Sequence, residues 1–244
     1  MNAAPDARPA ARSPAGFYGW WIVGLASLVG VLTGPGQSIG VSVFRQHLSD
    51  GLHLSDSAIA TAYLVGTLLS STLQPRIGRW VDQVGVRRAS TAFGIAFALA
   101  LAHMSMVRGV VWLAAGFFGI RLLGQGALSL TSTVAVMHWF DRRRGFALGL
   151  KMTLTMGGMS IVPILLAVAI DAWGWRIAWL AASAVIALTA VPVSWFGYVN
   201  RPADMGQLPD GEPPVHVGQL GSAPPSLTRS TALRSTAFWV LAAV

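Results

Sequence analysis

The chain alternates between long stretches without charged residues and short charged connections. Each uncharged stretch has at least about 18 residues, the length at which an α-helix spans a hydrocarbon core of roughly 30 Å. A helix also satisfies its own backbone hydrogen bonds in lipid, so the pattern predicts an all-α membrane protein with six transmembrane helices. The six stretches are 17–44, 57–75, 89–107, 122–140, 152–170 and 177–200.

The amino-acid composition supports this fold class and argues against several classes of function. Of the 244 residues, 54% are hydrophobic and 11% are charged, whereas a soluble domain has about 25% charged residues. The chain has no cysteine, which excludes disulfides and thiolate metal sites. No metal-ligand cluster, nucleophile motif or carboxylate pair occurs within the predicted spans, so neither an enzyme nor a cofactor is expected.

The basic residues indicate orientation rather than nucleic-acid binding. The formal net charge is +8, and 12 of the 17 Lys and Arg residues fall in the tail and connections on one side of the predicted bundle. The connections on the other side carry Arg45, Arg108 and Arg176. By the positive-inside rule, we expect a multi-pass protein of the cell (inner or plasma) membrane with a cytoplasmic N-terminus and no nucleic-acid partner.

Four regions follow from the same pattern. Residues 1–16 are expected to form a disordered cytoplasmic tail, and residues 17–200 the six-helix bundle. Residues 201–230 are polar and contain six prolines, so we expect a cytoplasmic linker with little reason to fold. Residues 231–244 resume an apolar pattern but are too short to span a bilayer, so we interpret them as the truncated start of a seventh helix in a fragment.

Two of the predicted helices contain residues that interrupt an α-helix. The segment 33–38 reads Thr-Gly-Pro-Gly-Gln-Ser, and its proline removes a backbone donor. Backbone groups freed at membrane depth need protein or a water-filled cavity beside them. The first interruption is therefore either a packing kink or a substrate-facing break. The predicted breaking residues are Gly34, Pro35, Gly36, Gly124 and Gly126.

The fourth predicted helix starts near Gly109, ahead of its uncharged stretch, so Arg121 falls deep within the span, 12 residues or about 18 Å from the outer end of the helix. An arginine at the bilayer centre costs about 2.5–3.5 kcal/mol on insertion scales, so it must face a polar interior or a partner. One interpretation is a structural pairing with Gln37, Gln125 or backbone carbonyls. The other is a charge in a transport path or its gate.

Lys151 is the second cation within a predicted span, because the fifth predicted helix starts after Arg144, seven residues before it. It lies about 10 Å into its helix, and either it snorkels back to the cytoplasmic interface or it attracts anions or takes part in coupling. Thr33 and Tyr63 are polar residues in the first two predicted helices. Together with Arg121, Gln37 and Gln125, these residues are the candidates for substrate binding and coupling.

A short motif occurs twice at a fixed offset. Asp82-x-x-Gly85-x-Arg87 recurs 89 positions later as Asp171-x-x-Gly174-x-Arg176, and the two Gly-x-Gly breaks lie 90 positions apart. These offsets align the first three predicted helices with the second three. Because three is odd, the two copies enter the membrane from opposite sides. This is an inverted repeat, which is typical of secondary transporters.

Both motifs resemble signatures of one known family. The signature loop of the Major Facilitator Superfamily resembles the segment Gly78-x-x-x-Asp82-x-x-Gly85-x-Arg87-Arg88. The arginine motif of that family resembles Arg121-x-x-Gly124-x-Gly126. The likeness covers residues 17–244, as the N-terminal half of a twelve-helix fold and the start of the second half. Two further segments resemble one branch of this family, the monocarboxylate porters and oxalate/formate antiporters. They are Tyr18-Gly19-Trp20-Trp21 and Trp139-Phe140-x-Arg142-Arg143-Arg144-Gly145. Gln83 departs from the family's usual basic residue, which implies a weaker charge network in the loop.

The resemblance implies a transporter that works by alternating access between two six-helix halves. Gly78, Asp82, Gly85, Arg87 and Arg88 would form a gating loop, with the Asp82 carboxylate bound to Arg87, Arg88 or a helix of the C-terminal half. The expected cargo is a small, monocarboxylate-like organic anion, moved with protons or by exchange. The alternatives are an exporter of an uncharged or cationic metabolite and a non-transporting membrane sensor.

Overall fold

The computed structural model describes residues 16–211, and every regular element in that part of the chain is a helix. The α-helices are α1 (Gly19–Leu32), α2 (Ser38–Leu52), α3 (Asp56–Val84), α4 (Val86–Ser105), α5 (Val110–Ile120), α6 (Ser129–Trp139), α7 (Arg144–Met159) and α8 (Val162–Pro192). Shorter 3-10 elements are η1 (Gly34–Gly36), η4 (Pro202–Met205) and η5 (Pro209–Gly211), and the π-helical ones are η2 (Arg121–Leu128) and η3 (Val193–Gly197). The expected tail, most of the linker and the expected seventh helix, at 1–15 and 212–244, lie outside the described residues.

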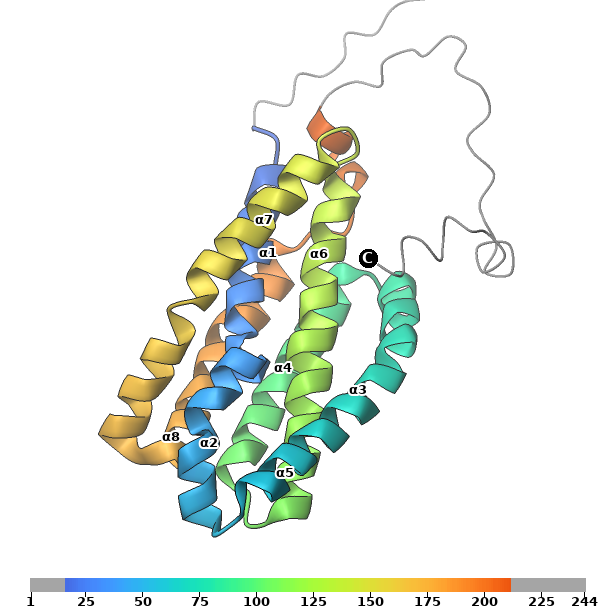
Figure 1. Cartoon of the computed structure of the whole chain (residues 1–244). Coiled ribbons are helices and arrows are strands. Elements are labelled where there is room, and N and C mark those ends of the chain that lie inside the picture. Colours follow the sequence, from blue (N-terminus) through green and yellow to red (C-terminus); the bar gives the residue numbers. More distant parts are fainter. Residues whose placement is uncertain (1–15, 212–244) are drawn as a thin grey trace, which may run out of the picture. The chain divides into compact units, whose positions relative to one another are not determined.

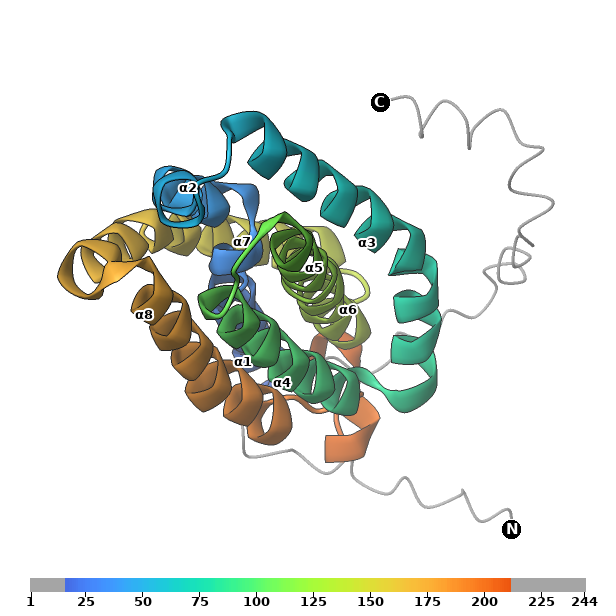
Figure 2. The same cartoon turned by 90° about the horizontal axis from the view of Figure 1, so that it is seen from below.

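The helices form one elongated bundle with short connections at its two ends (Figure 1). Helix α4 packs along α8, α3 along α5, and α1 along α7. Seen along the bundle, α1 lies in the interior, in contact with α6, α7 and α8 (Figure 2). Aromatic residues fill much of the core; the rings of Phe44 on α2 and Trp179 on α8 stack with centroids 3.9 Å apart.

The outside of the bundle is apolar. Leu99, Val111, Leu188 and Phe196 are between 66% and 78% exposed, and they lie on four different elements. A surface of this kind is unstable in water and suits lipid. The exterior therefore agrees with the membrane environment that the composition predicts.

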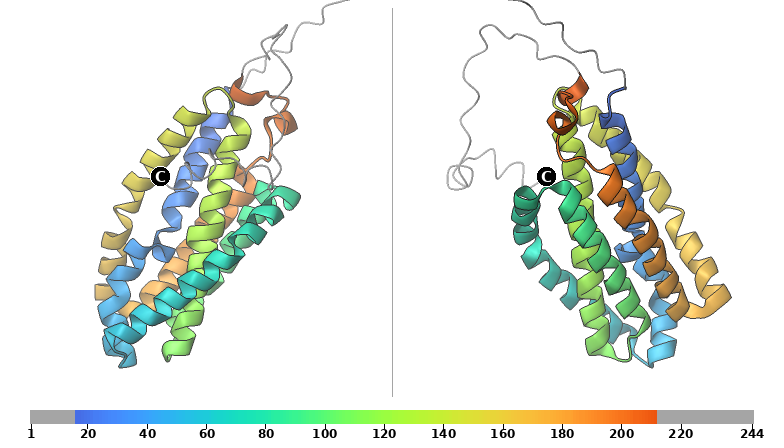
Figure 3. Two further views of the ribbon diagram at one scale, coloured as in Figure 1. Left: turned by 45° about the vertical axis from the view of Figure 1, so that its right-hand side comes forward. Right: turned by 180° about the vertical axis from the view of Figure 1, so that it is seen from behind.

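Two continuous helical stretches are long and apolar enough to cross a membrane, Val110–Trp139 and Arg144–Gly197, and α1 is a shorter apolar helix. The first predicted segment is divided because η1 separates α1 from α2. The fifth and sixth predicted segments join in one helical stretch, and the chain reverses at a bend within α8 (Figure 3). The number of membrane spans therefore stays a prediction.

The two copies of the repeated motif share one backbone conformation. Gly85, between α3 and α4, has φ 84° and ψ 156°, and Gly174, at the bend of α8, has φ 78° and ψ 158°. Glycine adopts such φ values readily, whereas L residues are strained there. After the second turn, Arg176 Nη1 donates to the carbonyls of Ser105 (2.7 Å) and Val107 (3.0 Å) at the end of α4. The same glycine conformation thus reverses the chain at both places.

The beginning of the expected linker is folded. Residues 201–211 form η4 and η5, and the Asp210 carboxylate accepts hydrogen bonds of 2.7 to 3.2 Å from the backbone N–H groups of residues 141–143. Gln207 Oε1 accepts another from the Tyr18 backbone N–H (3.1 Å). The expectation of an unfolded linker fails for these residues because the polar side chains that suggested it bind backbone groups of the bundle.

Candidate functional site

Arg121 begins η2, and its guanidinium contacts residues from three elements. Nη1 donates to Gln125 Oε1 and to Ser38 Oγ at the start of α2 (3.4 Å). The Arg121 Cζ lies 5.2 Å from the ring centroid of Tyr63 on α3, and the Tyr63 and Ser38 hydroxyls are 2.7 Å apart. No ion pair to Arg121 occurs among the described residues. Neutral groups therefore hold the guanidinium, and its positive charge is not cancelled by a neighbour.

The two interrupted segments meet beside Arg121. η1 contacts η2, and a Cβ on Gly36 would lie 2.7 Å from the Ile120 carbonyl oxygen. A Cβ on Gly126 would overlap the Gln74 side chain of α3. π-Helical segments such as η2 are rare and occur frequently at functional sites. The glycines thus permit the close approach that brings irregular backbone and a cation together at this point.

A cavity of about 590 Å³ opens beside Arg121. Its lining residues are Thr67, Ser70, Ser71, Gln74, Gly78, Arg121, Gln125, Gly126 and Leu130. Those from α3, at positions 67, 70, 71, 74 and 78, recur about once a turn, so they form one face of that helix. Thr67 Oγ1 is buried and has no hydrogen-bond partner among the described residues. Because buried hydroxyls are normally paired, this one is an unsatisfied polar group beside the cavity.

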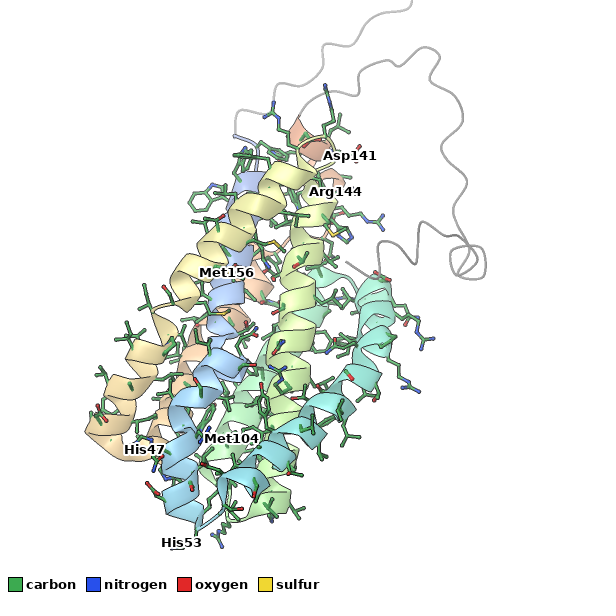
Figure 4. All side chains as sticks on the ribbon, in the orientation of Figure 1. His47, His53, Met104, Asp141, Arg144 and Met156 are labelled. Atoms are coloured by element: carbon green, nitrogen blue, oxygen red, sulfur yellow. The ribbon has the colours of Figure 1, made fainter. Side chains whose placement is uncertain are left out.

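The site lies between the two ends of the bundle. Asp141 and Arg144 mark one end and His53 the other (Figure 4). η2 connects α5, which begins at the His53 end, to α6, which ends beside Asp141. A central position of this kind is where secondary transporters bind their substrates, on interrupted helices.

Four other predicted residues, Thr33, Gln37, Tyr63 and Lys151, do not line this cavity, although Tyr63 contacts Arg121. Thr33 is fully buried; its hydroxyl donates to the Gly30 carbonyl (2.7 Å) and accepts from Gln37 Nε2 (3.1 Å). Lys151 on α7 is 6% exposed, and its Nζ donates to Thr133 Oγ1 on α6 (3.2 Å). The Lys151 ammonium group thus lies against α6 inside the bundle, whereas a snorkelling side chain would extend to the end of α7.

The predicted gating loop lies where α3 passes into α4. Asp82 and Arg88 are exposed, and Asp82 has no hydrogen bond or ion pair with any described residue. Arg87 donates its backbone N–H to Asn200 Oδ1 (3.0 Å), and its guanidinium lies 4.8 Å over the Trp195 ring. The expected bond from Asp82 to Arg87 or Arg88 is therefore not formed within this part of the chain, because Arg87 turns toward η3.

Several residues of the site were missed from the sequence. The polar face of α3 had a detectable signal, because Thr67, Ser70, Ser71 and Gln74 recur at helical spacing in a segment without charged residues. Ser38 had no such signal. It contacts Arg121 only because η1 turns the chain between α1 and α2.

An all-helical body with an apolar exterior, two interrupted helices and a cavity beside them that is lined by a cation has the architecture of a secondary transporter. The sequence matches the family model of the Major Facilitator Superfamily over residues 19–244. The chain therefore belongs to the Major Facilitator Superfamily. It is a multi-pass membrane protein of a family whose function is transport and not catalysis.

Curated relatives agree with this assignment. The chain is 26% identical over 193 residues to monocarboxylate transporter 14 of Homo sapiens (79% of this chain and 37% of the relative). It is 25% identical over 159 residues to monocarboxylate transporter 14 of Mus musculus (65% and 31%). It is 24% identical over 193 residues to a galacturonate transporter of Dickeya chrysanthemi (78% and 54%). The chain thus spans between 31% and 54% of the lengths of these relatives.

Proposed function

We propose that this chain forms part of a secondary transporter that moves a small, monocarboxylate-like organic anion across the cell membrane by alternating access. One observation carries the proposal. The Arg121 guanidinium has only neutral partners among the described residues and lines a cavity of about 590 Å³ whose wall also carries hydroxyl and amide side chains. A cavity of this volume suits a small-molecule ligand.

A carboxylate is the ligand that best complements this guanidinium. Arginine presents a planar fork of donors that matches the two oxygens of a carboxylate. Two unit charges 4 Å apart attract by about 4 kcal/mol at an effective dielectric constant of about 20, against about 1 kcal/mol in water. This attraction is similar to the insertion cost of about 2.5–3.5 kcal/mol for a mid-membrane arginine. A bound anion therefore offsets the cost of placing this charge within the membrane.

The relatives support the same ligand class. Their names refer to a monocarboxylate and to galacturonate, both of which are carboxylate anions. The hydroxyl and amide groups of α3 would bind further oxygen atoms of such a ligand. Coupling to protons or to a counter-anion would supply the driving force.

The α3–α4 loop is proposed as the gate on the cytoplasmic side. The exposed Asp82 carboxylate is free to accept hydrogen bonds from a cationic side chain or a helix N-terminus of a C-terminal half. Gly78, at the cavity wall, would let that helix approach closely. The excess of arginine in the connections on this side supports a cytoplasmic N-terminus.

A second candidate function follows from the neutral contacts of Arg121. Because Gln125, Ser38 and Tyr63 already surround the guanidinium, Arg121 would also suit a purely gating role in an exporter of an uncharged or cationic metabolite. A non-transporting membrane sensor is the remaining alternative. Each predicts a different result in a transport assay.

The test is an uptake assay with the full protein that the gene encodes, reconstituted in liposomes. Radiolabelled pyruvate, galacturonate, a neutral sugar and an organic cation are offered with and without a proton gradient. We expect uptake of a carboxylate and none of the cation. Uptake restricted to the neutral or cationic compound would favour the exporter, and no uptake of any compound would favour the sensor.

A further inference from the structure

Lys151 is the only lysine of the chain, and it is a buried cation. Its Nζ donates to Thr133 Oγ1 (3.2 Å), and no ion pair to it occurs in the part of the chain that the structure describes. An ammonium group has three donors, and one hydroxyl satisfies a single donor without neutralising the charge. Because an uncompensated buried charge is strongly unfavourable, packing alone does not explain a lysine at this position.

Lys151 lies at the end of a polar face that runs along η2 and α6. Arg121, Gln125, Ser129 and Thr133 follow one another at intervals of four, the spacing of one helix face. Arg121 donates to Gln125, the Thr133 hydroxyl donates to the Ser129 carbonyl (2.9 Å), and Lys151 donates to Thr133. Gln125 is exposed, and Ser129 and Thr133 are partly exposed. This face is therefore open to a ligand.

The two cations at the ends of this face lie at different depths. Thr133, the partner of Lys151, is 12 residues beyond Arg121, or about 18 Å at 1.5 Å per residue. Lys151 is seven residues beyond Arg144, which lies at the end of the bundle opposite His53 (Figure 4). Lys151 therefore lies between Arg121 and the end of the bundle at which α6 passes to α7.

We propose that Lys151 is a second anion-binding residue, which holds the carboxylate of the transported anion on the side where α6 passes to α7. This inference rests on the proposed function. An anion that leaves Arg121 meets the amide and hydroxyl groups of Gln125, Ser129 and Thr133 and then the Lys151 ammonium group. Lys151 therefore sets the affinity for the anion on that side of the membrane, and Arg121 sets it at the centre.

A labelling experiment tests this on the wild-type protein. The full protein that the gene encodes is treated with formaldehyde and dimethylamine–borane, which methylate accessible amines, and methylation of the peptide containing Lys151 is followed by mass spectrometry. We expect pyruvate or galacturonate, whichever is transported, to slow methylation about tenfold at ten times its Kd. The uncharged methyl ester is the control and should have no effect. Equal methylation rates with the anion and with its ester would overturn the proposal.

Transport kinetics give a second test and separate the two proposals. Lys151→Gln is expected to raise the KM for the anion offered on the α6–α7 side about tenfold, the effect of about 1.4 kcal/mol. The KM on the opposite side should stay within about twofold, and Lys151→Arg should restore both. Thr153→Val, on the exposed side of α7, is the matched control and should behave as wild type.

The outcomes are distinguishable. If wild-type protein transports a carboxylate and Lys151→Gln leaves both KM values unchanged, Lys151 is not an anion-binding residue and the proposed function stands. If wild-type protein transports no carboxylate, the proposed function fails and this inference fails with it. Should Lys151→Gln not reach the membrane, the labelling experiment decides.

Discussion

The Asp210 carboxylate holds the start of the linker against the connection between α6 and α7, and Asp210→Asn tests this contact. The carboxylate accepts from the backbone N–H groups of Asp141 (3.1 Å), Arg142 (2.7 Å) and Arg143 (3.2 Å). Asp210 has φ 60°, a left-handed conformation that Asn also tolerates. The substitution therefore removes the negative charge and one acceptor oxygen without adding backbone strain.

The expected loss follows from the hydrogen bonds. A bond to a charged group contributes about 1.5–3 kcal/mol, against about 0.5–1.5 kcal/mol for a neutral pair. Solvent at the end of the bundle screens part of this difference, so we expect the docking of residues 201–211 to weaken by about 1–2 kcal/mol. This free-energy difference lowers the equilibrium constant for docking by a factor of about 5 to 30.

Hydrogen–deuterium exchange measures this change directly. The amides of residues 141–143 should exchange about 5 to 30 times faster in Asp210→Asn than in wild type, because they lose their acceptor during local opening. Asp204→Asn is the matched control, since the Asp204 carboxylate accepts from Arg201 within its own turn (3.1 Å). Unchanged exchange at 141–143 in Asp210→Asn would refute the proposed role of this carboxylate.

The same contact predicts a pH dependence. Burial alone would raise the pKa of the Asp210 carboxyl, but the three backbone donors and the charge of Arg143 hold that pKa below its ordinary value. A carboxyl with a lowered pKa stabilises the folded form at pH values above its unfolded pKa of about 3.9, and this stabilisation is lost as the pH falls through the folded pKa. Protection at 141–143, corrected for intrinsic exchange rates, should therefore be constant near neutral pH and fall below about pH 4.

Further substitutions test the repeated turn and the gate. Gly174→Ala should lower the free energy of unfolding by about 1–3 kcal/mol, because φ 78° and ψ 158° are adopted almost only by glycine. Gly85→Ala should lower it by more, because a Cβ there would also lie 2.9 Å from Asn200 Oδ1. Thermal melting in detergent checks both against Gly149→Ala, where the added Cβ meets open space; equal melting temperatures for all three would contradict the argument. Asp82→Asn in the full protein should abolish or strongly slow anion transport without preventing membrane insertion. Near-normal anion uptake by that variant would exclude a gating role for Asp82.

The features that the sequence predicted best are those set by local chemistry. Apolar length and the absence of charge predict helices in a membrane, and the all-helical body agrees. The repeated Asp-x-x-Gly-x-Arg spacing predicted two related turns, and Gly85 and Gly174 share one backbone conformation. Family membership also followed from residues close together in the sequence, and the family comparison confirms it.

The features that escaped prediction depend on contacts between distant residues. Ser38 and Tyr63 are 25 positions apart and meet at Arg121 only because η1 and α3 approach η2. Asp210 is 69 positions from Asp141, and a proline-rich polar segment gives no sign that its carboxylate binds a distant loop. A short polar residue in a linker looks the same in the sequence whether solvent or backbone N–H groups surround it.

Anion binding at Arg121 is tested most directly by carboxylate uptake in the full protein carrying Arg121→Gln. An attraction of about 2–4 kcal/mol at an effective dielectric constant of about 20 predicts a loss of about 30- to 1000-fold in kcat/KM. Arg121→Lys should retain part of the activity, because it keeps the charge but not the planar fork. Arg45→Gln, which removes a surface cation paired with Asp56 (2.8 Å), is the control and should transport as wild type. Carboxylate uptake by Arg121→Gln equal to that of wild type would contradict an anion site at this arginine.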